Sequence, residues 1–356
     1  MLTPQQIESL ADAVIDAYQE FDTSLRVAAA RGIADAGIEL DREKVKAAIA
    51  AAGTPDDIAA AIMATYTQAA ALSLAQEATI YGAARAAGII ATFGGAADDM
   101  MVRNIVTQGI TTAINAHNLV ATTAVGAVQT ELAYILDRAM LSVATGAQTQ
   151  EQAVAWAVDN LAKGQTRVTY VSASGTVRND TLYTAVRRSI VTGTNQMSAR
   201  ITDARIQRYG VEYVEVSAHA GARPEHAEWQ GQVYLHRDLG EKCGYGAVDG
   251  LEGANCRHSH QPFFPGINEP TDYTGLERLD NDEEYRLSQR QRLCERNVRM
   301  YRSREDIYLA GGQAEAAGKA RRLRDKWYAE GEAVAAARRD FPRLNRMVPF
   351  PGEARW

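Results

Sequence analysis

The 356-residue sequence has few cysteines, prolines and aromatic residues, and it contains no long uninterrupted apolar run. Three cysteines, an odd number, do not indicate a disulfide framework, so we expect synthesis in a reducing cytoplasm. No stretch approaches the roughly 18 consecutive apolar residues of a membrane span, so we expect no membrane partner. The N-terminus lacks the basic and apolar regions of a secretory signal. These absences favour a folded, non-membrane protein that is large enough for two or three domains.

Charge is distributed unevenly along the chain. Residues 1–160 contain 8 Lys/Arg and 18 Asp/Glu, whereas residues 286–346 contain 16 Lys/Arg and 8 Asp/Glu. Arginine dominates the basic segment, which favours planar pairing with carboxylates or phosphates. This segment could contact nucleic acid or an acidic protein surface, or it could be a solvated face with ion pairs inside its helices.

The first 145 residues are predicted to be helical. Thr3 and Gln6 have the spacing of a capping box, and Pro4 suits the first helical position. Asp41 is a plausible cap for a helix over 42–52 that ends at Gly53. From Thr54 to Val143 the chain is rich in alanine, which favours helices that pack closely. Possible breaks are Gly82, Gly88, Gly94, Gly95 and Gly109. The segment 1–145 is therefore predicted to be an arm or a bundle.

The pattern changes within residues 146–268. Thr149 caps a helix that ends at Gly164, and alternating β-branched residues from Arg167 predict a hairpin that returns through 176–178. Asp180 is predicted to cap a long helix that ends before Gly210. Strands are predicted at 212–217 and 232–235. The fold class is α+β, with a small α+β module at 146–268 whose compact part begins near residue 165.

The remaining segment, 269–356, is predicted to be a basic helical extension. Residues 281–304 and 312–340 have modest apolar stripes of helical period, and prolines begin at its entry. Pro342 to Trp356 is predicted to be an extended terminal arm.

Histidine and cysteine are concentrated in one short region. Five of the six histidines and two of the three cysteines lie between positions 219 and 260. Glycines at 244, 246, 250 and 253 disfavour helix and long strand there. Side-chain hydrogen bonds, a metal or packed aromatic residues must therefore hold this segment.

A metal is one interpretation of the cluster. His219, His226, Cys256 and His258 could supply four ligands to zinc, with His260 and Cys243 in reserve. Their spacing matches no standard zinc finger, and in an extended Cys-x-His segment two ligands on one face would crowd each other. In the alternative interpretation Cys256 is a small buried side chain and the histidines hydrogen-bond the glycine-rich backbone. We adopt the alternative, and so predict no cofactor, with zinc as the competing hypothesis.

Catalysis is less well supported. Cys256 with His226 or His258, oriented by Asn255 or Asp249, has the residue types of a thiol hydrolase, and His219, His226 and Glu228 could gather a divalent ion for a nuclease. No nucleophile motif or phosphate-binding loop accompanies them. We therefore predict no catalytic residues. Structural roles explain the same segment without catalysis. We assign such roles to Arg223, Trp229, Gly244, Gly246, Asn255 and Arg257. The two arginines are predicted to pair with Glu215, Asp249 or Glu252.

Two segments carry a family resemblance. Ser217-x-His219-x-Gly221-x-Arg223-Pro224-x-His226 is followed by Gly253-x-Asn255-Cys256-Arg257-His258. Together they resemble the signature of the phage minor capsid protein 2 family, which is related to the phage Mu F-like head morphogenesis proteins. The resemblance is densest from about Val186 to Ile267.

The resemblance implies a structural protein of a tailed-phage virion, not an enzyme. Such a protein would be made in the host cytoplasm and located in the head near the portal. Its partners would be the portal protein, other head proteins and, through the basic extension, packaged double-stranded DNA.

Overall fold

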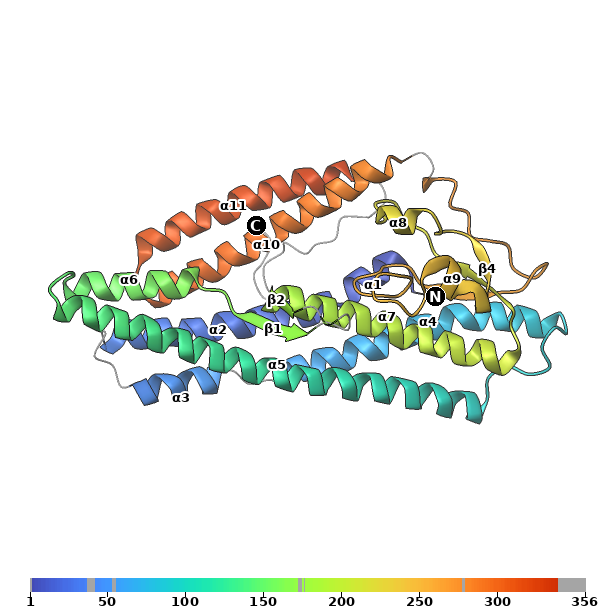
Figure 1. Cartoon of the computed structure of the whole chain (residues 1–356), viewed down its shortest axis with the longest axis horizontal. Helices are drawn as coiled ribbons and strands as arrows, with labels where there is room; N and C mark the ends of the chain where they lie inside the picture. Colours follow the sequence, from blue (N-terminus) through green and yellow to red (C-terminus); the bar gives the residue numbers. More distant parts are fainter. Residues whose placement is uncertain are drawn as a thin grey trace.

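The computed structural model describes residues 2–36, 42–52, 56–171, 175, 177–276 and 279–338. Long helices run side by side along an elongated molecule, and a small sheet lies at one end (Figure 1). The first elements are α1 (Pro4–Leu10), α2 (Asp12–Ala36), α3 (Arg42–Ala52), α4 (Asp56–Ala86), α5 (Ala96–Ala144) and α6 (Gln150–Lys163). The rest are β1 (Arg167–Val171), β2 (Val177–Thr181), α7 (Leu182–Tyr209), β3 (Tyr213–Val216), α8 (Pro224–Ala227), β4 (Val233–Leu235), α9 (Leu239–Cys243), β5 (His260–Phe263), α10 (Asn281–Ala310) and α11 (Ala314–Ala337).

Local signals explain how several helices begin. The Thr3 hydroxyl accepts a hydrogen bond from the Gln6 amide while the Gln6 side chain bonds back to Thr3, which confirms the predicted capping box. Thr149 and Gln152 form the same box at α6. The cap of α7 was predicted one residue early. Thr181, not Asp180, accepts from the third amide of the helix, because Thr181 directly precedes Leu182, the first residue of α7.

Two of the predicted glycine breaks are wrong. Gly82 and Gly109 lie inside α4 and α5, and the chain turns only between Ala86 and Ala96, where Gly88, Gly94 and Gly95 have positive φ. A lone glycine costs a helix about 1 kcal/mol, which packing can offset. A Cβ at Gly109 would lie 3.2 Å from Met197 Cγ, so glycine there lets α5 and α7 approach closely.

The strands form two small sheets. β1 and β2 pair as the predicted antiparallel hairpin, with Arg167 opposite Thr181. The second sheet has the order β4-β3-β5, and both of its pairs are antiparallel. β3 and β4 were predicted, whereas β5 was not. Pro262 lies within β5, which is an edge strand of its sheet and so tolerates the missing amide.

A single helical core runs through all three predicted segments. It includes Leu2 and Val128 from the N-terminal helices, Leu161 and Ile190 from the middle, and Tyr308 from α10. The boundaries at residues 145 and 268 remain a prediction, but the segments share this core. A second core lies beneath the three-stranded sheet and includes Tyr81, Val214, Trp229, Leu251 and Phe264.

The basic extension folds back as a helical hairpin. α10 and α11 pack along each other, and α10 also packs on α2 and α6 (Figure 1). Ion pairs join the two helices, since Glu305 bonds both Arg321 and Arg324. Other pairs cross to the acidic N-terminal helices, and Arg299 reaches Asp16. The basic segment was expected to contact an acidic protein surface, and part of that surface therefore belongs to the same chain.

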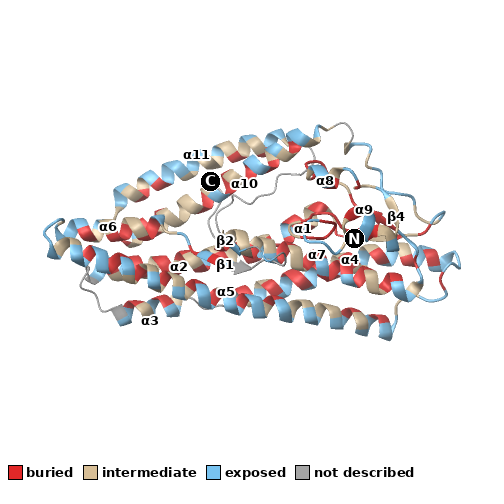
Figure 2. Ribbon diagram, viewed as in Figure 1, coloured by how far each residue is buried: buried red, intermediate tan, exposed pale blue. Residues whose placement is uncertain are grey.

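Two helices qualify as membrane spans by length and composition. They cover Ile58–Ala86 and Ala96–Ala144, with 39% and 33% of their most apolar windows buried within the protein. Polar residues interrupt both segments, so neither contains an uninterrupted apolar run. Both carry carboxylates that pair inside the protein, Glu77 with Arg205 and Glu131 with Arg26. Figure 2 shows one side of α5 buried and the other exposed.

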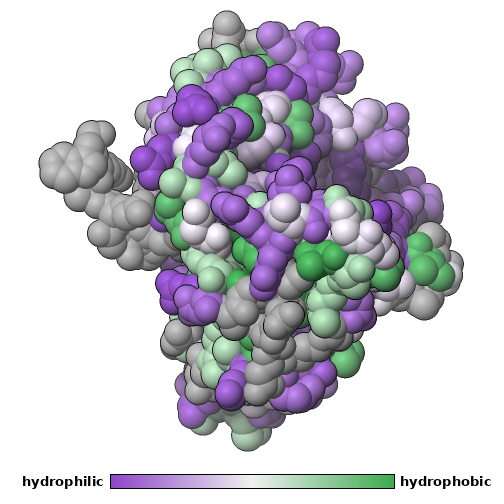
Figure 3. All heavy atoms as spheres, turned by 90° about the vertical axis from the view of Figure 1, so that its left-hand side faces the viewer, coloured by the Kyte–Doolittle hydropathy of each residue, from purple (hydrophilic) through white to green (hydrophobic). Residues whose placement is uncertain are grey.

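Seen from the end at the left of Figure 1, hydrophilic side chains predominate and hydrophobic ones are scattered among them (Figure 3). The terminal segment from Pro342 to Trp356 lies outside the described residues, as do Asp41, the stretch 53–55 and part of the β1–β2 turn.

A buried charge triad joins α4, α5 and α7. Arg205 donates to Glu77 at 3.1 Å and to Asp98 at 2.6 Å, and all three side chains are at most 7% exposed. Buried carboxylates that lose their partner are costly because water cannot reach them.

We expect Arg205→Ala to destabilise the full chain by about 3–5 kcal/mol, because Glu77 and Asp98 would remain buried without their cation. Chemical denaturation monitored by circular dichroism measures this. Arg208→Ala, an exposed position on the same helix, is the control and should cost less than about 0.5 kcal/mol. Equal effects for the two variants would contradict the importance of the triad.

Candidate functional site

The three-stranded sheet brings the two signature segments together. Beyond the β3–β5 pairing, the Ser217 amide donates to the Ser259 carbonyl, and the Ser259 amide donates to the Ser217 hydroxyl. His219 therefore lies just after β3 and His258 just before β5, at the same end of these two paired strands. α8, which begins at Pro224 as predicted, places His226 beside them.

Close backbone packing explains the glycines of the loop before β5. A Cβ on Gly250 would lie 2.0 Å from the Gly244 carbonyl oxygen, and one on Gly253 would lie 2.4 Å from the Val248 oxygen. Gly244 and Gly246 have positive φ, at 62° and 90°. Glu252 and Asn255 also have positive φ, which is unusual for residues other than glycine. The loop therefore has a specific, tightly packed shape.

One face of α7 supports this loop. Asn195 donates through Nδ2 to the His258 carbonyl at 2.9 Å, and the Thr192 hydroxyl accepts from the Asn255 amide at 3.1 Å. Gln196 donates to the Glu252 carbonyl. These positions recur at helical spacing, so α7 presents a polar strip to backbone groups that have no strand partner.

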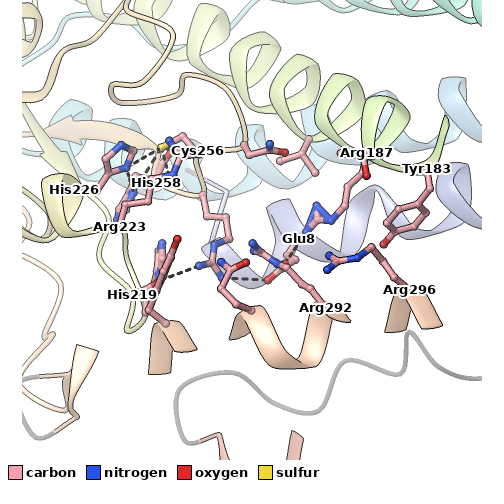
Figure 4. Close-up of a pocket in the computed structure, with 17 residues that line it drawn as sticks. Glu8, Tyr183, Arg187, His219, Arg223, His226, Cys256, His258, Arg292 and Arg296 are labelled. Carbon is pink, nitrogen blue, oxygen red and sulfur yellow. Dashed lines mark hydrogen bonds and ion pairs between the residues drawn. The ribbon is translucent and has the colours of Figure 1, made fainter. Parts of the chain in front are cut away.

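Three side chains of the cluster converge within the loop (Figure 4). The Nδ1 atoms of His226 and His258 are 3.4 Å apart, and Cys256 Sγ lies 3.7 Å from the first and 3.6 Å from the second. All three residues are at most 3% exposed. We expected Cys256 and His258 to crowd each other in an extended segment. Both side chains nevertheless reach the cluster, in a segment that follows a turn with Asn255 in the left-handed region.

His219 lies beside these three without joining them. Its ring stacks on His258 with centroids 4.5 Å apart, and its Nδ1 bonds the Ala220 carbonyl at 2.9 Å. Burial lowers the pKa of His219, His226 and His258, so all three rings are neutral at pH 7. The reserve candidates His260 and Cys243 lie elsewhere, in β5 and at the end of α9.

A cavity of about 260 Å³ adjoins the cluster. Its wall includes one carboxylate, Glu8, among five arginines: Arg187, Arg223, Arg257, Arg292 and Arg296 (Figure 4). Glu8 is 3% exposed and pairs with arginines from three parts of the chain. Arg187 lies 2.7 Å away, Arg257 3.3 Å and Arg292 3.4 Å.

The predicted structural set is positioned with two corrections. Trp229 packs in the core beneath the sheet, and Asn255 joins the loop to α7. Arg257 pairs with Glu8 and donates to the Gly221 carbonyl, whereas Arg223 donates to the Ala254 carbonyl at 2.7 Å. The predicted partners of both arginines were therefore wrong. Arg257 pairs with Glu8 because α1 packs against the loop, and Arg223 bonds the backbone of the loop itself.

A second, partly buried cluster was not predicted from the sequence. His260 lies 3.0 Å from Glu252 through Nδ1 and 3.3 Å from Asp203 through Nε2, and Asp203 also bonds His236 at 2.7 Å and Tyr245 at 2.6 Å. The two carboxylates raise the pKa of His260 to about 10 despite its burial. Hydrogen bonds to His236 and His260 hold the pKa of Asp203 below its usual range. Only the concentration of histidines pointed to this region.

The geometry argues against the catalytic alternatives. Burial raises the pKa of the Cys256 thiol to about 11, whereas a nucleophile needs a thiolate. His226 is oriented through Nε2 by the Asp249 backbone carbonyl, not by a carboxylate. Glu228 is exposed, and among the described residues it belongs to no group that could hold a metal.

Comparison with known proteins finds a family match over most of the chain. The family model described as phage minor capsid protein 2 matches residues 2–329. A curated protein named "Structural protein" from Lactococcus phage LL-H is 28% identical over 201 residues, which is 52% of each chain. This chain thus spans about half the length of that relative. No solved structure matches it.

The comparisons indicate a structural protein of a bacteriophage head. The chain belongs to the phage minor capsid protein 2 family, which confirms the resemblance found in the signature segments. The match covers the N-terminal helices and α10 as well as the signature.

We expect Arg257→Ala to destabilise the full chain by about 1–3 kcal/mol, because the buried Glu8 carboxylate and the Gly221 carbonyl both lose a donor. Thermal melting is the measurement. Arg237→Ala removes an arginine whose side chain is 80% exposed and should leave the midpoint nearly unchanged. An unchanged midpoint for Arg257→Ala would mean that the remaining arginines satisfy Glu8 without it.

The His260 cluster predicts a pH dependence. The folded-state pKa of His260, about 10, exceeds the ordinary value of 6.5, so its contribution is complete below pH 6.5 and is lost as pH rises through about 10. We therefore expect the melting temperatures of the wild type and of His260→Gln to differ most near pH 6 and to converge by about pH 10. A difference that stays constant over this range would contradict a charged His260.

Proposed function

We propose that this phage head protein attaches to the portal and that the exposed side of α5 is an attachment surface. The observation that carries the proposal is a row of large apolar side chains on that side. Leu119, Tyr134 and Leu141 are 71%, 61% and 63% exposed. By helical spacing they lie opposite the buried side, which includes Val128 and Leu132.

The length of α5 supports this role. Its 49 residues extend roughly 74 Å at about 1.5 Å per residue. Exposed apolar side chains that share one side of a long helix favour an interaction site there. Among the partners of a head protein, the portal and neighbouring head proteins fit this surface best, because it carries little charge.

DNA is a weaker candidate for the principal partner. Many arginines of α10 and α11 already pair with carboxylates. Arg290 bonds Glu330 through Nε at 2.7 Å, and Arg299 pairs with Asp16. Arginines that pair within the protein contribute less to phosphate binding, since binding would require these pairs to break.

We expect the double variant Leu119→Asp/Leu141→Asp to enter particles at least about tenfold less than wild type, because two buried contacts would each become a desolvated carboxylate. The measurement is the amount of this protein per portal in purified heads. Asn104→Asp/Asn118→Asp adds the same charge at exposed positions of α5 without removing apolar area, and it should enter normally.

Circular dichroism should show both variants folded. Cross-linking of wild-type particles should then join α5 to the portal. Normal incorporation of the Leu119/Leu141 variant would refute the surface, and cross-links only to other proteins would refute the portal. Flotation of the purified protein with lipid vesicles would instead indicate that this side of α5 contacts a membrane.

A further inference from the structure

Three atoms of the signature loop have the spacing of zinc ligands. Zinc in proteins is tetrahedral, with bonds of about 2.0–2.1 Å to nitrogen and about 2.3 Å to sulfur. Adjacent ligands in such a tetrahedron are then about 3.4 Å apart for two nitrogens and about 3.6 Å for nitrogen and sulfur. The distances among His226 Nδ1, His258 Nδ1 and Cys256 Sγ are 3.4, 3.7 and 3.6 Å. One triangular face of the tetrahedron is therefore already formed.

Hydrogen bonds at the far side of each ring determine which nitrogen carries the proton. Nε2 of His226 lies 2.7 Å from the Asp249 carbonyl, which can only accept. Nε2 of His258 lies 2.9 Å from Gln230 Oε1, and the same oxygen accepts the His219 amide at 3.0 Å. Each neutral ring therefore donates through Nε2. Its Nδ1 carries a lone pair that points into the cluster.

A cation between the three atoms would satisfy this arrangement. Two lone pairs that face each other at 3.4 Å repel, and the single thiol proton of Cys256 can satisfy only one of them. Donation from the outer nitrogen of a histidine to a carbonyl is also the usual way in which a metal-binding ring is oriented. The sulfur accepts the His258 amide at 3.4 Å, an interaction that stabilises a thiolate.

We infer that His226, Cys256 and His258 bind a zinc ion through Nδ1, Sγ and Nδ1. The mixed nitrogen and sulfur ligands favour zinc over calcium or magnesium, which prefer oxygen. On binding, the Cys256 S–H bond breaks, a Zn–S bond forms and the proton passes to solvent. The same three residues line the cavity, so the fourth position is directed to water or to a ligand there.

The zinc connects two parts of the chain that no strand pairing connects. It links α8 to the turn before β5 and so holds the glycine-rich loop in shape. The second group, Asp203, His236 and His260, differs in this respect. Nδ1 of His260 hydrogen-bonds Glu252, and its Nε2 lies 3.3 Å from Asp203 as an ion pair, so carboxylates already face both ring nitrogens.

The test uses the untagged full-length chain, so that no affinity tag binds metal. Elemental analysis of the purified wild type should find about one zinc per chain. Cys256→Ser should lose most of this zinc. Cys243→Ser replaces another buried cysteine of the same module and should retain it. Wild-type protein with less than about one zinc per ten chains, both as purified and after dialysis against zinc, would overturn the inference.

A second, spectroscopic measurement uses only the wild type, so it does not depend on whether a variant folds. Wild-type protein stripped with a chelator and titrated with Co²⁺ should develop the strong visible bands of a tetrahedral ion and a thiolate-to-cobalt band in the near ultraviolet. Removing the metal should also lower the melting temperature by several degrees, reversibly with zinc. Weak octahedral bands without the thiolate band would show that these residues do not bind the metal.

Discussion

The rest of the structure depends on one buried carboxylate. Glu8 of α1 is almost inaccessible to water, and a buried charge of this kind is tolerated only when it is paired. Its partners come from α7, from the signature loop and from α10, through Arg187, Arg257 and Arg292. Glu8 is therefore one point at which the acidic N-terminal part of the chain meets its basic parts, and the pair of Arg299 with Asp16 is another. The acidic and basic parts of the sequence are therefore complementary to each other within one chain.

The signature loop is held between this pairing and the polar face of α7. Its backbone groups bond Thr192, Asn195 and Gln196 because few of them have strand partners. Tight contacts at Gly250 and Gly253 leave no room for side chains. Within this frame the neutral histidines and Cys256 face one another, so the cluster is a product of the packing around it. The exposed side of α5, with Leu119, Tyr134 and Leu141, lies outside that frame.

Local features of the fold were predictable from the sequence, because their causes lie within a few residues. The capping boxes at Thr3 and Thr149 and the left-handed Gly210 at the end of α7 depend on adjacent backbone groups. The β1–β2 hairpin follows from alternation over a short segment. The predictions failed where a distant element decided the outcome. Gly109 remains helical because Met197 packs against it, and β5 forms because β3 offers it an edge.

The sequence by itself determined the family, the helical character of both ends and the concentration of histidine and cysteine around the signature. It did so because residue identity and short spacing carry that information. Only the tertiary structure decided that Arg257 pairs with Glu8, that His260 lies between Asp203 and Glu252, and that His219 stacks beside the other ligand candidates. Each of these outcomes depends on side chains far apart in the chain meeting where water is excluded. Pairing and protonation are set by that environment, which no local pattern encodes.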